Sequence, residues 1–212
     1  QDVAKEQNVD VFDVPYCSDD NMARTVLDFL FAAQDATNSA LAYSIDVLDE
    51  DRFVVNKLRN EIDNIETPIW TNMNDTSKFI PYTAKVSNQL LHHKPPVPMI
   101  PYMAKKDTVF AGRKITKGTV VIPSITYSAR TSGGSIDFLP ERPDQDTQFV
   151  KTVVFGGGQH KCPGRRYAES LLTVFLAVLA QDFDFYRIGE RPGVDEFVYF
   201  PTLFPKDCDF VI

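Results

Sequence analysis

The segment of this sequence with the most chemical potential is FGGGQHKCPG, which runs from Phe155 to Gly164. It is not a phosphate-binding loop, because Cys162 follows Lys161 where a P-loop needs Ser or Thr, and a dinucleotide-binding G-x-G-x-x-G pattern also fails at Lys161. The simplest alternative is a glycine-rich turn with a passive cysteine, since free cysteines are usually small buried hydrophobes. The combination of three glycines with His160 and Gly164, each two residues from the cysteine, favours a functional loop.

This loop is suited to hold a thiolate against a flat ligand. Its glycines permit positive φ and a close approach of the backbone. Cys162 comes just before a predicted helix, whose free N–H groups and dipole stabilise negative charge on the sulfur. Phe155 can pack beside the ligand, and His160 can donate a hydrogen bond to a carboxylate at its rim.

The same segment resembles the heme-ligand loop of the cytochrome P450 family, F-x-x-G-x-[HR]-x-C-x-G. Phe155, Gly158, His160, Cys162 and Gly164 match every fixed position. The resemblance implies that these five residues bind the cofactor, heme b, and that Cys162 is the axial thiolate of its iron. Such a ligand supplies electron density that favours O–O cleavage. His160 would meet a heme propionate.

A second segment, AAQDAT at residues 32–37, is similar to the family's oxygen-activation stretch, [AG]-G-x-[DE]-T-[TS]. Asp35 falls on the acid position and Thr37 on the final hydroxyl, whereas Ala33 and Ala36 replace the usual Gly and first Thr. The resemblance implies that Asp35 and Thr37 are catalytic and relay protons to bound dioxygen. The alternative is that both side chains only bond the backbone of a bent helix. Without that Gly, we expect the helix to bend less.

The family's E-x-x-R pair is replaced in this chain. Counting back from the two prolines at 95 and 96 places Gln89 and His92 on those positions. In the family the pair binds an arginine of a later loop, for which Arg142 is the candidate. Gln89 and His92 retain neutral hydrogen-bonding groups, but charge-assisted bidentate pairing is lost, and an unpaired buried arginine is costly. Two alternatives follow: a network rebuilt locally, or a degenerate, non-catalytic heme-binding relative.

The family's substrate pocket has its counterparts in VPMIPYM at residues 97–103 and in the C-terminal VYFPTLFP. Ordinary strand core is the alternative for these apolar residues. Tyr102 lies near a position that often holds a propionate-binding Arg or His. Together, FLFAAQDAT, YTAKVSNQLL and KPPVPMIPY look most like the sterol C-22 desaturase branch, which introduces a double bond into the sterol side chain.

The resemblance implies an oxidoreductase that activates dioxygen to hydroxylate or desaturate an apolar, sterol-like substrate. Electrons would come from NADPH through NADPH–cytochrome P450 reductase or a similar donor. A basic cluster on the cysteine side consists of Lys151, Lys161, Arg165 and Arg166. It can steer such an acidic partner; the alternative is an ordinary solvated surface. The implied location is the cytosolic face of the endoplasmic reticulum membrane, with attachment through an N-terminal part outside this chain. A structural interaction domain without heme would leave FGGGQHKCPG unexplained.

The elements that must position these residues follow from apolar periodicity. A helical period predicts a long helix over residues 21–48, which carries Asp35 and Thr37. Further helices are predicted over 51–65, over 81–93 and, directly after the cysteine loop, over 165–181. Two or three short strands are predicted within 97–127 and hairpins within 183–212, whereas 1–20 and 128–150 read as largely irregular. The fold class is α+β, mainly α, similar to the C-terminal half of the P450 fold: a long distal helix, short β-sheets, the cysteine-ligand loop and a proximal helix.

Composition excludes several other classes. The 212 residues are 43% apolar and carry a net charge of −7, which argues against a nucleic-acid-binding domain. Cys17, Cys162 and Cys208 are far apart and form no C-x-x-C pair, so a disulfide framework or a usual zinc spacing is not expected. Cys17 and Cys208 are expected to be passive, in a reducing compartment.

The length also bears on domain organisation. No apolar stretch approaches the roughly 18 residues that a membrane span needs. Members of the P450 family are about twice as long as this chain. We therefore expect residues 1–212 to be the C-terminal part of a single heme-thiolate domain whose N-terminal half is absent, and to bind heme weakly and without turnover when alone.

Overall fold

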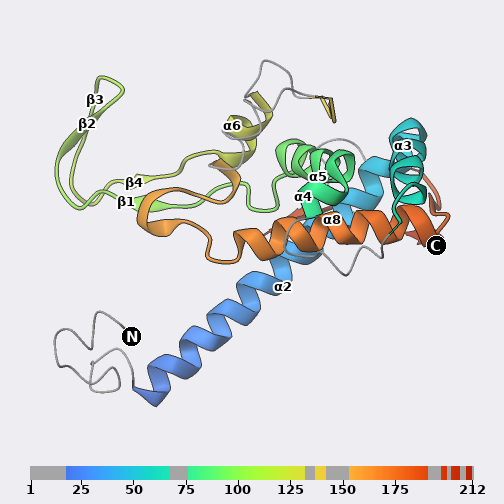
Figure 1. Cartoon of the computed structure of the whole chain (residues 1–212). Helices are drawn as coiled ribbons and strands as arrows, with labels where there is room; N and C mark the ends of the chain where they lie inside the picture. Colours follow the sequence, from blue (N-terminus) through green and yellow to red (C-terminus); the bar gives the residue numbers. More distant parts are fainter. Residues whose placement is uncertain are drawn as a thin grey trace.

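The structure is a computed structural model that describes residues 18–66, 76–131, 137–141, 153–190, 197–199, 202–205 and 209–211. It is mainly helical with short antiparallel sheets, so the predicted fold class is confirmed (Figure 1). The described α-helices are α2 (Asp19–Glu50), α3 (Arg52–Asp63), α4 (Thr76–Phe79), α5 (Pro81–His93), α6 (Ile125–Thr131) and α8 (Arg165–Asp182). Within these ranges no helix has both the length and the apolar character needed to cross a membrane.

The strands of the described ranges pair two by two, always antiparallel. β1 (Tyr102–Met103) pairs with β4 (Val120–Val121), and between them β2 (Thr108–Phe110) pairs with β3 (Arg113–Ile115). Towards the C-terminus, β5 (Tyr186–Arg187) pairs with β8 (Phe210–Val211), and β6 (Phe197–Tyr199) pairs with β7 (Leu203–Pro205). Residues 97–127 thus hold four strands rather than two or three, because β1 and β4 form the stem, and β2 and β3 the outer part, of one interrupted hairpin.

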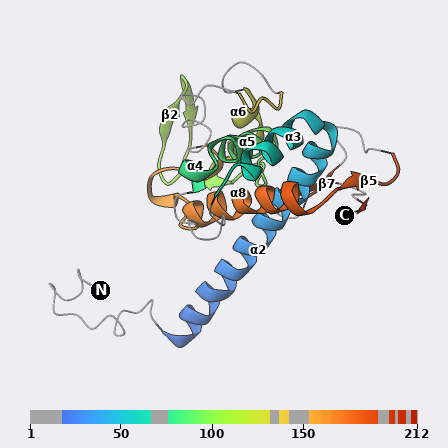
Figure 2. The same ribbon diagram turned by 45° about the vertical axis from the view of Figure 1, so that its right-hand side comes forward.

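The core lies where α3, α5 and the second half of α2 pack around α8. Leu48 of α2, Leu58 of α3, Val86 of α5 and Leu176 of α8 are each at most 1% exposed. Figure 2 shows α8 lying alongside α5 with α2 crossing it, so the helix that follows the cysteine loop is held on several sides. The proximal and distal helices predicted from the sequence therefore share one core.

Helix α2 is one uninterrupted α-helix of 32 residues. The Ser18 side chain accepts a hydrogen bond from the Asn21 N–H, and Asp19 and Asp20 fall in the first turn, where negative charge is favoured. Residues 18–34 are exposed, residues 35–37 are partly buried, and Ser39 is fully buried. The helix therefore changes from an exposed to a packed element at the segment that contains Asp35 and Thr37.

A side chain of α3, that of Glu61, binds the N-terminus of α5. Glu61 accepts hydrogen bonds from the N–H groups of Tyr82 and Thr83, at 2.6 and 2.8 Å, and from the Thr83 hydroxyl at 2.7 Å. It thereby caps the N-terminus of α5, whose own N-cap residue, Ile80, makes no side-chain cap bond. This cap fixes the helix that carries Gln89 and His92.

Candidate functional site

The cysteine loop is closed by its own backbone. The Cys162 N–H donates to the carbonyl oxygen of Phe155 at 2.8 Å, and a short 3₁₀ turn, η5 (Gly158–His160), lies between them. Gly156 adopts a φ of +71°, and a Cβ there would lie 3.0 Å from the His160 carbonyl oxygen. Gly158 also has positive φ, at +61°. The turn therefore needs glycine at these two positions.

The sulfur-bearing residue is partly exposed and precedes a helix N-terminus. Gly164 is the N-cap of α8. Because Cys162 precedes this N-cap by two residues, the loop lies at the positive end of the helix dipole. A Cβ at Gly164 would lie 4.0 Å from the Cys162 sulfur, in ordinary contact. The partly exposed Cys162 thus lies directly before the helix N-terminus.

Two aromatic side chains, one from the loop itself and one from β1, make ring contacts here. Phe155 packs against the helical core, and the Arg165 guanidinium lies 5.8 Å from the centre of its ring. The Tyr102 ring of β1 lies edge-on to the ring of His160, with 6.1 Å between their centres. Sequence reasoning associated both Tyr102 and His160 with a propionate, and the structure brings these two residues together.

The loop and the start of α8 line a pocket of about 490 Å³. Its positive side chains are Lys161, Arg165 and Arg166, whereas Lys151, the fourth member of the basic cluster, lies outside the described residues. Glu169 also lines the pocket and pairs with Arg165 at 3.2 Å. Sequence reasoning missed Glu169, although the i,i+4 spacing on a predicted helix was the available signal.

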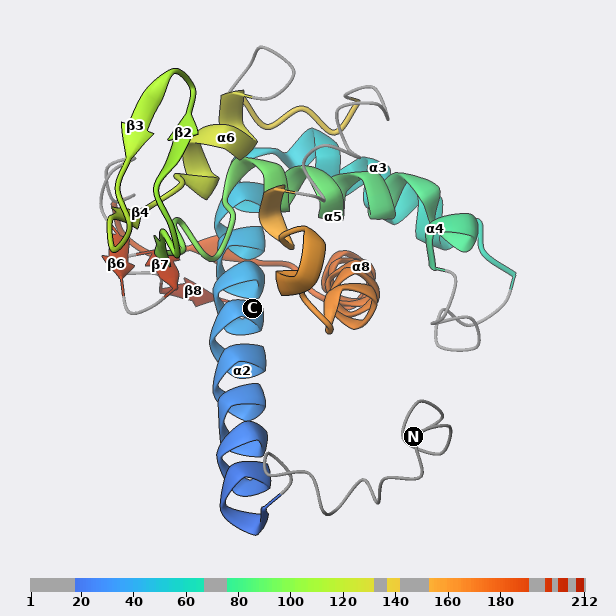
Figure 3. The same ribbon diagram turned by 90° about the vertical axis from the view of Figure 1, so that its left-hand side faces the viewer.

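Asp35 and Thr37 lie on α2, just before the part of that helix that packs in the core. From the crossing of α2 and α8, the first half of α2 and the cysteine loop extend to the same side (Figure 1), and Figure 3 shows the loop between these two helices. Among the described residues, Thr25 and Ser44 bond backbone carbonyls of α2. The side chains of Asp35 and Thr37 take no part in the hydrogen bonds found there.

Gln89 and His92 are core residues of α5, at 2% and 0% exposure, and each is held by at least one interaction. Helix α5 packs against α8, so these two residues lie in the helix layer next to the helix that follows the cysteine loop. Arg142, proposed as their partner, lies outside the described residues, as do Cys17 and Cys208. The helix is intact without the Glu and Arg of the family pattern.

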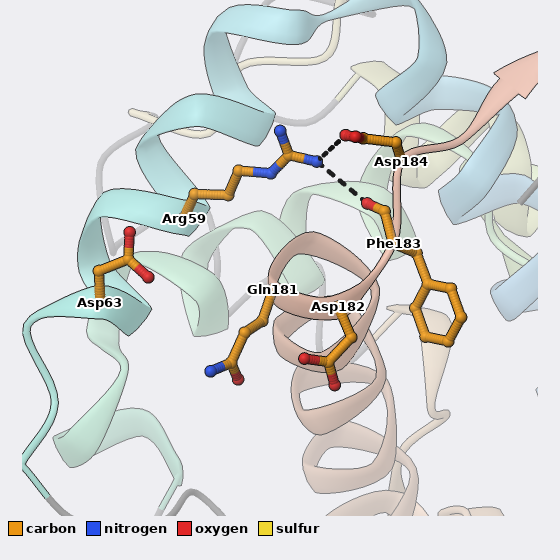
Figure 4. Close-up of a pocket in the computed structure, with 6 residues that line it drawn as sticks. All are labelled: Arg59, Asp63, Gln181, Asp182, Phe183 and Asp184. Carbon is orange, nitrogen blue, oxygen red and sulfur yellow. Dashed lines mark hydrogen bonds and ion pairs between the residues drawn. The ribbon is translucent and has the colours of Figure 1, made fainter.

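A second pocket, of about 320 Å³, lies at the other end of α8 (Figure 4). Arg59 of α3 reaches into it and donates to the carbonyl oxygens of Ala180 and Phe183 and to the Asp184 carboxylate. These bonds satisfy carbonyl groups at the C-terminus of α8. Arg59 therefore joins α3 to the C-terminus of α8.

The residues at the cysteine loop fit a heme. Among the described residues no group of three or more His, Cys, Asp or Glu side chains is arranged to hold a metal ion. A metal bound by protein side chains alone usually has three or four such ligands. Cys162, which is partly exposed, can supply one sulfur ligand to an iron whose other ligands come from a macrocycle. Exposed apolar side chains such as Phe29 of α2 and Met103 of β1 offer further surface to a flat apolar group.

Comparison with known proteins gives a consistent result. A sequence model of the family described as "Cytochrome P450" matches residues 8–198. "Cytochrome P450 710A2" of Arabidopsis thaliana is 32% identical over 201 residues, which cover 91% of this chain and 40% of that protein. "C-22 sterol desaturase erg5" of Aspergillus fumigatus is 30% identical, over 89% of this chain and 38% of that protein. "C-22 sterol desaturase ERG5B" of Gibberella zeae is 31% identical, over 92% and 38%. The chain spans about two fifths of the length of these relatives.

Proposed function

Since the chain belongs to the cytochrome P450 family, we propose that it is the C-terminal part of a heme-thiolate oxidoreductase whose iron is bound by Cys162. The observation that carries this proposal is the partly exposed Cys162 in a loop shaped by glycines, directly before the N-terminus of α8. The proposal assigns residues 1–212 to a single heme domain that needs a further part of the protein to enclose its cofactor.

The cofactor, when bound, supplies the activation of dioxygen, and the residues of this chain hold and orient it. Cys162 donates the sulfur ligand. His160 and Tyr102, whose rings are in contact, are placed to donate hydrogen bonds to a propionate at the same edge. Phe155, Gly158 and Gly164 shape the loop so that the ligand can approach its backbone.

Asp35 and Thr37 are proposed to deliver protons on the opposite side of the cofactor. Both lie on the part of α2 where the helix emerges from the core, and both are partly buried. A carboxylate and a hydroxyl on one helical turn can pass protons through water to an oxygen atom.

The proposed substrate is an apolar, sterol-like molecule, which the enzyme hydroxylates or desaturates. Two relatives are named C-22 sterol desaturases, and Met99 and Ile100 present exposed apolar side chains before β1. In a desaturation, two hydrogen atoms leave adjacent carbons, dioxygen takes up these and two electrons with two protons, and two water molecules form. NADPH provides the two electrons through a reductase.

The proposed electron donor docks on the cysteine side. Lys161, Arg165 and Arg166 give that pocket a positive potential that attracts an acidic partner. This role fits a protein at the cytosolic face of the endoplasmic reticulum, where an NADPH–cytochrome P450 reductase would reach it.

Turnover tests the proposal in the longest reading frame that contains this chain, with a reductase and a panel of sterols. Thr37→Ala is expected to lower product formed per NADPH consumed, and Asp35→Asn to slow turnover by at least about 100-fold. Thr25→Ala, on the same helix, is the control and is expected to match the wild type. If both site variants match that control, the assignment of Asp35 and Thr37 is wrong.

A second candidate is a heme-binding relative without catalysis, motivated by Gln89 and His92 at the E-x-x-R positions. It predicts thiolate-bound heme without any NADPH-dependent oxygen consumption in the presence of a reductase. Restoring the charges with Gln89→Glu and His92→Arg is then expected to increase heme retention. Oxygen consumption coupled to a sterol product would exclude this candidate.

A further inference from the structure

A short segment between α6 and the cysteine loop is docked on the helical core by side chains outside the candidate site. This segment, residues 137–141, lies beside α5 (Figures 1 and 3). The Phe138 ring packs against the core and lies 6.2 Å from the His93 ring, centre to centre. Pro140 is buried, although the residues on either side of it are exposed. The segment is therefore held by its side chains and not by a helix or strand of its own.

The last residue of the segment, Glu141, is bound by Lys57 of α3. The Lys57 ammonium lies 2.8 Å from a carboxylate oxygen of Glu141. It also lies 4.8 Å from the centre of the Phe53 ring and 5.3 Å from that of the Tyr82 ring. The faces of aromatic rings attract a cation, so these contacts hold the ammonium in place. The bond from Lys57 lowers the pKa of the Glu141 carboxyl, so both partners are charged at neutral pH.

The two ends of the segment lie near the two ends of one face of α5. Phe138 meets His93 at the C-terminus of the helix, whereas the Lys57 ammonium that binds Glu141 lies over Tyr82 at its N-terminus. Tyr82 and His93 are about three helical turns apart, so they lie on the same side of α5. Gln89 lies between them on that side and is 2% exposed. The segment therefore runs along the face of α5 that carries Gln89.

The docking of this segment bears on the position of the cysteine loop. Phe138 packs against the same core cluster as Val154 and Phe155, which begin that loop. Helix α5, which the segment covers, packs in turn against α8, the helix that follows Cys162. Gln89 carries no charge with which to bind the segment, whereas Lys57 on the neighbouring helix supplies one. The contact between Lys57 and Glu141 is therefore placed to fix the chain before the cysteine loop.

We propose that Lys57 is a positioning residue that anchors residues 137–141 along α5 through Glu141, and that this anchor supports retention of the cofactor at Cys162. The charge on α3 thereby compensates for the charge that α5 lacks at Gln89. The proposal rests on the proposed function, because it assumes that Cys162 binds heme. The alternative is an ordinary surface ion pair, with side chains 39% and 64% exposed, which contributes little to the fold or to the site.

A double-mutant cycle tests the anchor in the longest reading frame that contains this chain. Lys57→Met keeps the length of the side chain without its charge, and Glu141→Gln keeps the shape of the carboxyl group. Each is expected to raise the equilibrium constant of unfolding about fivefold. The double variant is expected to raise it about fivefold as well, and not about 25-fold, because both changes remove one contact. Lys57→Arg retains the charge and the ring contacts and is expected to match the wild type.

Heme transfer to an excess of apomyoglobin measures retention of the cofactor. Lys57→Met, Glu141→Gln and the double variant are each expected to lose heme about fivefold faster than the wild type, and Lys57→Arg at the wild-type rate. Arg52→Met is the matched control on α3. Arg52 also binds a carboxylate, that of Asp49 at 2.7 Å, and lies over an aromatic ring, that of Phe185, but these contacts are away from residues 137–141. This control is expected to lower stability at least as much and to lose heme at the wild-type rate.

Three results would count against this account, and they can be told apart. Additive effects in the cycle would overturn the anchor. Heme loss from Arg52→Met as fast as from Lys57→Met would overturn the role in retention, because heme loss would then follow general stability. A wild type without thiolate-bound heme would refute the proposed function and the role in retention with it, whereas the cycle in the heme-free protein still decides whether Lys57 anchors the segment.

Discussion

The capping of α5 by Glu61 has a consequence for stability that can be worked out from the structure. Glu61 accepts three hydrogen bonds, at 2.6, 2.8 and 2.7 Å, two of them from N–H groups in the first turn of α5. Hydrogen bonds to a charged group contribute about 1.5 to 3 kcal/mol each, and three that share one carboxylate are not additive. We expect Glu61→Ala to lower the free energy of unfolding by about 3 kcal/mol and Glu61→Gln, which keeps one acceptor oxygen, by about 2 kcal/mol.

Urea denaturation measures this effect. A loss of about 3 kcal/mol shifts the unfolding midpoint by about 1 to 2 M for a typical dependence on urea. Asp63→Asn is the matched control, because it removes the same charge from an exposed position of the same helix and is expected to stay within about 0.5 kcal/mol. If Glu61→Ala shifts the midpoint no more than this control, Glu61 does not hold α5, and the explanation for the position of Gln89 and His92 is wrong.

Two further predictions concern partly buried groups. Asp46→Ala is expected to destabilise the fold by about 3 kcal/mol, because the side chain of its ion-pair partner Arg187 is only 5% exposed. Chemical denaturation measures the effect, with Asp28→Ala, at an exposed position of α2, as the control. Equal unfolding midpoints for the two variants would contradict the prediction. Burial, with help from Glu141, raises the pKa of Tyr82 from 10.0 to about 12. The unfolded chain therefore loses this proton first, so stability is complete below pH 10 and falls as the pH rises towards 12. Unfolding midpoints at about pH 9 and about pH 11 should show a smaller fall in Tyr82→Phe, and an identical fall would refute the cause.

The helices could be predicted well because their sequences agree with their packing. The prediction over residues 81–93 coincides with α5, since Pro81 begins the helix and the prolines at 95 and 96 follow its end. The predicted helix over 21–48 is shorter than α2, which begins directly after the capping Ser18. At the other end it continues to Glu50, because the Asp51 N–H still bonds the Leu48 carbonyl.

Short elements could not be predicted, because local signals compete there. Residues 125–131 begin with Ile, Thr and Tyr, which favour a strand, yet they form α6 after Ser124, whose side chain accepts a bond from the Tyr127 N–H. The interruption of the long hairpin depends on Ala104, which exchanges backbone bonds with Gly118 and Thr119. No pattern in the sequence predicts this irregular pairing.

The candidate site, too, could be predicted only in part. The cysteine loop could be identified because five fixed positions fall within ten residues, so chain connectivity alone brings them together. The contact between Tyr102 and His160 joins elements that lie far apart in the sequence, and only the fold supplies it. The position of Phe110 opposite Arg113 in the β2–β3 hairpin likewise depends on the strand register, which the sequence pattern did not give.

The most direct test of the central claim is the carbon monoxide spectrum of the reduced protein. It is recorded for the longest reading frame that contains this chain, with Cys162→Ala and, as a control, Cys208→Ala. Thiolate-bound heme predicts a strongly red-shifted Soret band in the wild type and in Cys208→Ala that is absent in Cys162→Ala. A band at the same position in all three proteins, or no Soret absorption in any of them after heme addition, would contradict the assignment of Cys162 as the iron ligand.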